Sequence, residues 1–257
     1  MSNSRRPTNR TASQQATPRS TQVVIAVVAV LCVVAVVVVG ILARDSGKDS
    51  SAAGSGSESV TQETPASGGC SEAPAPPTSP KSYSAAPDPS VAEGATWVAT
   101  VTTNCGDIEL ELDGAKAPQT VASFLQLSTD SFYDDTPCHR LTTDGIFVLQ
   151  CGDPTGSGSG GPGYGYGIEN APKDGAYPTG TLAMARSSDP NSNGSQFFIV
   201  YQDTMLPVEG GGYTIFGKVT KGLDIVQSIA DKGVDGGAAD GAPSQPISIL
   251  SVSVEKA

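Results

Sequence analysis

An uninterrupted apolar segment at residues 23–43 divides this chain into parts that cannot share one fold. The segment carries no charge and consists mostly of Val, Ala, Ile and Leu. About 20 such residues are enough for a helix to cross the hydrocarbon core of a bilayer. A cleaved signal peptide is the alternative, but its apolar region usually has only about 7–15 residues. We therefore predict a transmembrane helix over residues 22–43.

Charges on the two sides of this segment indicate its orientation. Residues 1–21 contain four arginines and no acidic residue, whereas behind the segment Arg44 and Lys48 are matched by Asp45 and Asp49. Positive residues favour the cytoplasmic side of a membrane. We expect residues 1–21 to be a disordered cytoplasmic tail, because their polar composition cannot build a core. The remainder would lie outside the cytoplasm, as part of a single-pass protein of the cell membrane.

Composition separates a linker from a folded domain in the rest of the chain. Residues 44–93 are rich in Ser, Gly, Ala and Pro, which is typical of a tether. From residue 94 to 257 the apolar residues become patterned, and this part has eight Lys and Arg against nineteen Asp and Glu. An acidic domain of this kind repels phosphate backbones, so we predict no nucleic-acid partner. We expect the domain to be monomeric.

Four cysteines, Cys70, Cys105, Cys138 and Cys151, fall on the expected outer side of the membrane. An even number in an oxidising compartment favours disulfides. The spacing has no C-x-x-C pair of the kind that zinc sites use, and we predict no metal and no cofactor. Cys138 and Cys151 flank a predicted hairpin and are the first pair to consider, which would leave Cys70 with Cys105. The sequence leaves the connectivity open.

Residues 94–257 show the periods of short strands and two helices. Period-two alternation at 97–102 and 107–112 predicts a hairpin around a Gly-containing turn. A helix is expected from Pro118 and a second over 223–230, with strands at 197–201, 214–219 and 247–254. The Gly-rich stretch 152–180 is expected to be a surface loop. This order predicts a mainly β fold, a closed antiparallel barrel with helices capping its ends.

The chemistry-bearing residues of this domain are few. The chain's only histidine, His139, precedes Arg140, and Gln196 joins a polar turn to the apolar strand at 197–201. No nucleophile stands beside a base, which disfavours a hydrolase. Cations, amides and aromatic side chains instead suit a pocket that holds an apolar group and hydrogen-bonds a peptide.

Five motifs follow one another along residues 138–219. They are Cys-His-Arg at 138–140, Gln-Cys-Gly-Asp-Pro at 150–154, Leu-Ala-Met-Ala at 182–185, Asn-Gly-Ser-Gln-Phe-Phe-Ile at 193–199 and Ile-Phe-Gly-Lys-Val at 215–219. In order and spacing this set resembles the cyclophilins, which are peptidyl-prolyl cis/trans isomerases. The resemblance runs from residue 95 to the C-terminus. It implies an eight-stranded antiparallel barrel capped by two helices, here in a bacterial membrane-anchored form.

The resemblance also implies roles for individual residues. Arg140 matches the family's central catalytic arginine. The implied catalytic set is His139, Arg140, Phe147 and Gln150. The implied substrate-binding set is Val148, Gly158, Gln196, Phe198, Met205, Leu206 and Tyr213. Met205 stands where some members have a tryptophan that supports cyclosporin binding, so we expect weak sensitivity to that drug.

The function implied is isomerisation of X-Pro bonds in proline-containing polypeptides, assisting the folding of exported proteins. Arg140 would stabilise the twisted amide beside an apolar proline pocket. The alternative is a proline-peptide-binding or chaperone module with the same fold and little turnover. It is motivated by two departures from the family pattern: residues 186–189, and a stretch at 141–149 that is two residues longer than usual.

Overall fold

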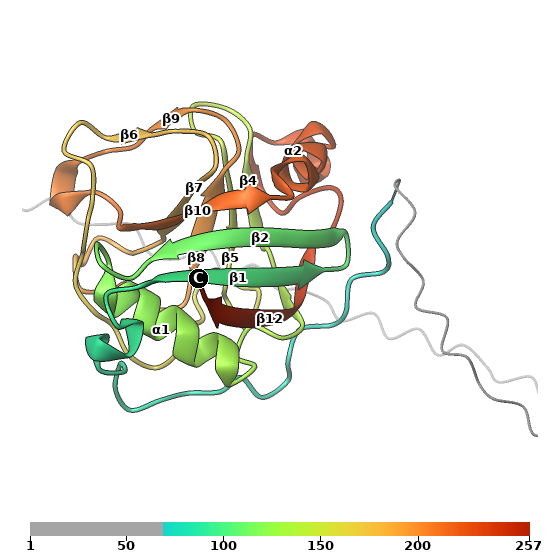
Figure 1. The fold of residues 1–257 in the computed structure, drawn as a ribbon. Coiled ribbons are helices and arrows are strands. Elements are labelled where there is room, and N and C mark those ends of the chain that lie inside the picture. Colours follow the sequence, from blue (N-terminus) through green and yellow to red (C-terminus); the bar gives the residue numbers. More distant parts are fainter. Residues whose placement is uncertain (1–68) are drawn as a thin grey trace, which may run out of the picture. The chain divides into compact units, whose positions relative to one another are not determined.

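One antiparallel sheet of ten strands organises residues 69–257, the residues that the computed structural model describes (Figure 1). Its strands are β1 (Thr96–Thr103), β2 (Gly106–Asp113), β3 (Thr136–Pro137), β4 (Arg140–Thr142), β5 (Val148–Cys151), β7 (Thr181–Met184), β8 (Phe197–Val200), β10 (Ile215–Lys221), β11 (Asp240–Gly241) and β12 (Ser248–Lys256). Their order is β11-β4-β5-β8-β7-β10-β2-β1-β12-β3. A separate pair joins β6 (Ala176–Tyr177) to β9 (Thr204–Met205). The mainly β, antiparallel prediction is confirmed.

The predicted hairpin forms β1 and β2, joined by a turn in which Gly106 has a positive φ of 125°. Alternate residues of both strands are buried, among them Val101 and Leu110, and their neighbours are more exposed. This is the burial pattern of a sheet with one core face and one wet face. The period-two pattern therefore sufficed to place this hairpin.

Both predicted helices are present, and they lie below and above the β1–β2 hairpin in the view of Figure 1. Helix α1 (Pro118–Thr129) opens on its proline and buries Phe124, whose ring lies 5.3 Å from the ring of Tyr133 and 5.8 Å from that of Phe197. Helix α2 (Leu223–Asp231) buries Val226 and Ile229. Three short 3-10 helices complete the described elements: η1 (Pro89–Ala92), η2 (Glu209–Gly211) and η3 (Asp235–Gly237).

The sheet does not close into the expected eight-stranded ring. β11 and β3 are its two ends, and each pairs on one side only. The opening lies between these two ends, and β3 and β4 are consecutive in the chain, separated only by Cys138 and His139. The backbone that leads from β3 to β4 therefore crosses the opening, where no ladder of hydrogen bonds joins the two ends of the sheet. The Cys138 N–H donates to the Ile247 carbonyl at 2.9 Å and holds this crossing beside β12.

Strand β12 changes face partway along, which its simple alternation did not predict. Thr102 pairs with Ser251, but the next residue of β1, Thr103, pairs with Ile249. This leaves Leu250 unmatched, as in a β-bulge, and a bulge reverses which residues point to the core. Ile249 is therefore buried, and beyond the bulge Val252 packs against the core.

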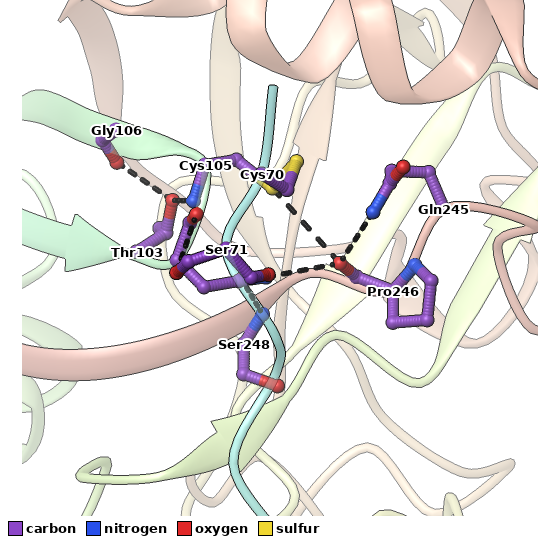
Figure 2. The surroundings of a disulfide bond; sticks show 9 residues. Cys70, Ser71, Thr103, Cys105, Gly106, Gln245, Pro246 and Ser248 are labelled. Carbon is purple, nitrogen blue, oxygen red and sulfur yellow. Dashed lines mark hydrogen bonds between the residues drawn. A yellow bond between two sulfur atoms is a disulfide. The ribbon is translucent and has the colours of Figure 1, made fainter. Parts of the chain in front are cut away.

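Residues 69–93, which composition placed at the end of a linker, are held against the domain. Cys70 forms a disulfide with Cys105, and Figure 2 shows this bond with Ser71 beside it. The Ser71 N–H donates to the Asn104 carbonyl at 2.7 Å, and the Tyr83 N–H donates to the Pro162 carbonyl at 2.8 Å. The ordered domain therefore extends before residue 94.

The second disulfide joins Cys138 to Cys151, so the pairing considered first is confirmed. Cys138 lies two residues before β4, and Cys151 is the last residue of its neighbour β5. The expected transmembrane helix at 22–43 and tail at 1–21 lie outside the described residues. Between residues 69 and 257, no helix has the length and apolar character needed to cross a bilayer.

Candidate active site

Strand register places three of the predicted site residues in a row. Arg140 on β4 is the partner of Gln150 on β5, and Gln150 is the partner of Phe198 on β8. Directly paired residues project from the same face of a sheet, about 4.8 Å from strand to strand. Residues that are ten and forty-eight positions apart in sequence thus form one continuous surface strip.

A cavity of about 150 Å³ opens beside this row. Its apolar walls come from strands and loops that meet only in the folded state. Phe198 and Tyr213 form one corner, with ring centroids 5.8 Å apart in an edge-to-face arrangement. The remaining lining side chains are Arg140, Ile146, Val148, Gln150, Ala185, Arg186 and Leu206. The cavity is small, with apolar side chains on its walls and polar groups on its rim. This combination suits a compact apolar ring attached to a peptide.

A chain of hydrogen bonds crosses the rim. The Arg140 guanidinium donates from Nε and Nη2 to the two carboxylate oxygens of Asp240, both at 2.7 Å. Its Nη1 donates to Gln150 Oε1 at 3.1 Å. Gln150 Nε2 in turn donates to Gln196 Oε1 at 2.8 Å, and Gln196 Nε2 donates to the carbonyls of Gly158 and Gly160. Each amide is thereby oriented by the next group.

The Arg140–Asp240 pair keeps both groups charged. Hydrogen bonding to the Asp240 carboxylate, which accepts from the guanidinium, raises the pKa of Arg140, although partial burial of the guanidinium acts in the other direction. The same bond lowers the pKa of Asp240. The site therefore presents a permanent cation and no group poised to exchange a proton near neutral pH, so it can stabilise charge but is not built for acid–base chemistry.

A second and larger cavity, of about 750 Å³, adjoins the first. The two share Gln150, Ala185 and Arg186. The loop 158–165 forms one wall of the larger cavity and the turn at 192–196 another. The Asp153 carboxylate shapes this loop by accepting the N–H groups of Thr155 at 2.7 Å and Gly160 at 3.1 Å. A peptide seated with one ring in the small cavity could continue along the larger one.

Three residues of the predicted set line neither cavity: Phe147, Met205 and His139. Phe147 lines neither cavity: its ring packs 6.0 Å from the ring of Tyr201 on the core side. Alternation is the reason, because Val148 faces the small cavity and its neighbour must face the other way. Ile146, two residues before Val148, takes that wall position. Met205 is 63% exposed and also lines neither cavity.

His139 sits in the crossing between β3 and β4 and points away from the row. Both its ring nitrogens are buried without a hydrogen-bond partner. The ring lines a separate cavity of about 290 Å³ among Pro74, Pro137 and Pro246. Burial is the main cause that lowers its pKa; Arg140 adds to this effect and Asp153 opposes it. His139 thus lies beside the site in a cavity of its own, where burial favours the neutral form of its ring.

This burial predicts a pH-dependent stability. As pH falls below about 6.5, the unfolded chain binds a proton at His139 that the folded state resists, so the free energy of unfolding should decrease. The stabilisation that comes from keeping His139 neutral is fully present above pH 6.5. It is lost as the pH falls toward the lowered pKa of His139 in the folded state. Urea unfolding between about pH 7 and 5 measures this slope. His139→Phe should remove it, because the chain has no other histidine; an equal slope in the variant would contradict the assignment.

Sequence reasoning missed three residues of the site. Asp240 lies a hundred positions after Arg140 in a Gly-rich segment with no motif, so nothing local pointed to it. Arg186 was noted only as part of a departure from the family pattern. Ile146 could have been found by counting alternate positions back from Gln150, with Val148 between them.

Comparisons with known proteins bear on this geometry. The family model "Cyclophilin type peptidyl-prolyl cis-trans isomerase/CLD" matches residues 98–254. The chain is 42% identical over 174 residues to the "Probable peptidyl-prolyl cis-trans isomerase B" of Mycobacterium leprae, covering 63% of this chain and 58% of that protein. It is 37% identical over 158 residues to a "Peptidyl-prolyl cis-trans isomerase" of Acinetobacter baylyi, covering 60% of this chain and 82% of the relative.

Comparison with solved structures finds the same family. A crystal structure of a cyclophilin type peptidyl-prolyl cis-trans isomerase from Cryptosporidium parvum superposes with a TM-score of 0.53 at 32% identity, covering 62% of this chain and 98% of the other. A structure of the same protein in the presence of the dipeptide Ala-Pro gives a TM-score of 0.52 at 34% identity, with the same coverage. The chain spans just over half the length of the mycobacterial relatives it matches.

Proposed function

The chain belongs to the family of cyclophilin-type peptidyl-prolyl cis-trans isomerases, and we propose that it catalyses rotation about X-Pro bonds in proteins folding outside the cytoplasm. The observation that carries this proposal is the row of Arg140, Gln150 and Phe198 along an apolar cavity of about 150 Å³. The proline ring would occupy that cavity, and the Arg140 guanidinium would face the amide bond that precedes it.

The reaction breaks no covalent bond, which matches the groups present. Rotation of a peptide bond costs about 18–20 kcal/mol because the nitrogen lone pair is delocalised into the carbonyl. An X-Pro bond differs little in energy between cis and trans but interconverts over tens to hundreds of seconds. A catalyst therefore needs only to bind the twisted amide, with its lone pair localised on nitrogen, more tightly than either planar form.

Arg140 is suited to that task. A guanidinium keeps its charge and holds its donors in one plane, so it can donate to the proline nitrogen or to the turning carbonyl as their electron density changes. Phe198, Val148 and Leu206 would hold the ring still, so that rotation occurs on the acyl side. Gln196, fixed by the loop carbonyls of Gly158 and Gly160, would hydrogen-bond the peptide backbone.

The direct test is catalysis itself. NMR exchange spectroscopy on a blocked Ala-Pro peptide measures the cis/trans interconversion rate with and without the full-length chain, purified in mild detergent. We expect exchange to become far faster in its presence. No acceleration at any peptide concentration would contradict the proposed activity.

Asp240 is a positioning residue in this proposal, because its carboxylate accepts hydrogen bonds from Nε and Nη2 of Arg140 and so fixes the orientation of the guanidinium toward the substrate. Asp240→Ala should lower kcat about tenfold with little change in KM, because a swinging guanidinium loses its alignment with the amide. Asp240→Asn, which keeps one acceptor oxygen, should retain part of the activity. Peptide-exchange kinetics at several substrate concentrations separate kcat from KM.

Glu111→Ala provides the matched control for Asp240. This substitution removes the exposed ion pair between Glu111 on β2 and Lys218 on β10. Neither of these two residues lines a site cavity. The control should leave both kinetic constants unchanged. A rise in kcat for Asp240→Ala would mean that Asp240 restrains Arg140, and would overturn the positioning role.

The location is also a proposal. The predicted span at 22–43, the four arginines before it and the two disulfides together support a domain tethered outside the cytoplasm, where disulfides persist. Proline-limited exported proteins would then be its substrates. Protease added to spheroplasts should release the domain by cutting the predicted linker; protection of the domain would argue for the opposite orientation.

A binding module without useful turnover is the second candidate. It is favoured by the contacts of Arg140, whose Nε and both Nη atoms already donate to Asp240 or Gln150. Peptide titration followed by NMR distinguishes the two functions. Saturable shifts with an unchanged exchange rate would support a binder, whereas catalysed exchange supports the isomerase.

A further inference from the structure

Charge is unevenly distributed between the two cavities and the rest of the domain. Residues 69–257 contain nine Lys and Arg against twenty-two Asp and Glu. Yet the lining of the two cavities holds two arginines, Arg140 and Arg186, and no acidic residue. The lining where a peptide would bind therefore differs in charge from the domain as a whole, since it carries cations and no carboxylate.

The two arginines are not equivalent. Arg140 is neutralised by the bidentate contact with Asp240. Arg186 takes part in none of the ion pairs formed within residues 69–257. Its partners are backbone carbonyls: Nε donates to Gly212 at 2.7 Å, and Nη1 donates to Ser187 at 2.8 Å. Carbonyl groups orient the guanidinium but, unlike a carboxylate, bring no formal negative charge to it.

The guanidinium of Arg186 is held in a fixed place. Gly210, Gly211 and Gly212 all have positive φ, which other residues rarely adopt, and this turn directs the Glu209 and Gly212 carbonyls at Arg186. A Cβ at Gly210 would lie 3.4 Å from Nη2, so the turn passes close to the cation. On the other side, the Arg186 Cζ lies 5.0 Å from the ring centroid of Tyr213, at cation–π distance.

Arg186 also stands where the two cavities join, because it lines both of them. A peptide with its proline ring in the small cavity that continues along the larger one runs past this cation with the residues next to the proline. We propose that Arg186 selects substrates with a carboxylate side chain within two residues of the proline. The inference rests on the proposed function and adds to it a preferred substrate class.

Two series of three peptides, each series varied at one position, test the selection. Blocked Ala-Pro peptides would carry Glu, Gln or Lys either two residues before the proline or directly after it, and kcat/KM would be measured by NMR exchange with the full-length chain. At one of these positions Glu should exceed Gln by about three- to tenfold, with Lys lowest, as expected for a half-buried ion pair. About 0.5 M added salt should shrink the difference.

Variants assign the effect to this side chain. Arg186→Gln should abolish the preference, so that the ratio of kcat/KM between the Glu and Gln peptides falls to about one whatever the absolute turnover. Arg186→Lys, which keeps the charge, should preserve the order. Lys232→Gln removes one exposed cation at the end of α2, outside both cavities, and should change nothing. This control separates a local contact from a change in net charge.

The outcomes separate this inference from the proposed function. Equal turnover of the Glu, Gln and Lys peptides at both positions would overturn the selection and leave the isomerase intact. If no peptide is turned over, the proposed activity fails, and the order of the three peptide Kd values from NMR titration decides the selection. A Glu preference that survives in Arg186→Gln would also overturn it.

Discussion

Arg140→Ala is expected to lower kcat/KM for a prolyl peptide by about 10²- to 10³-fold. Loss of one preorganised donor to a charge that develops in a transition state typically costs this much. The twisted amide would then face Gln150, a neutral amide that cannot replace a cation. NMR exchange spectroscopy on an Ala-Pro peptide measures the rate directly, with no coupled protease.

Arg140→Lys refines this prediction, since it keeps a positive charge but loses the planar set of donors that contacts Asp240 and Gln150 together. We expect it to recover only a small part of the activity. The free energy of unfolding should change by about 1 kcal/mol or less in either variant, because the Arg140–Asp240 pair is exposed by 38% and 55%. Wild-type turnover in a folded Arg140→Ala variant would rule out the proposed role of this side chain.

Removing the Cys138–Cys151 disulfide is expected to reduce both stability and activity. The bond closes a short loop, with a sequence separation of 13, and the chain-entropy estimate for such a loop is about 3 kcal/mol. Cys138 lies two residues before Arg140, and Cys151 directly follows Gln150. The bond therefore ties together β4 and β5, the neighbouring strands that carry Arg140 and Gln150. Urea unfolding and peptide exchange on Cys138→Ser/Cys151→Ser measure the two effects.

The other disulfide is the matched control. Cys70–Cys105 has a sequence separation of 35, so its loss should cost slightly more, about 4 kcal/mol. Neither of its cysteines lines a site cavity, and Cys70→Ser/Cys105→Ser should therefore keep the wild-type kcat/KM. If both double variants lose activity equally, the effect is one of global stability, and the tie between β4 and β5 has no special role in catalysis.

Local patterns in the sequence determined much of this protein. The β1–β2 hairpin follows from alternation at 97–102 and 107–112, and α1 follows from Pro118 and a helical period of apolar residues. The motifs located Arg140, Gln150, Gln196 and Phe198, which the structure brings together. Such features are predictable because each depends on residues that are close in the chain.

Tertiary structure alone decided which groups meet. Phe147 lies outside the small cavity and Ile146 lines it, because the pairing of β5 with β8 sets which side of the strand faces the cavity. Asp240 reaches Arg140 only because β11 pairs with β4 at the end of the sheet. Arg186 is held at the junction of the two cavities only because the loop 209–212 packs against its guanidinium. These contacts join segments with no shared period, so register and loop packing, which no local pattern encodes, determine them.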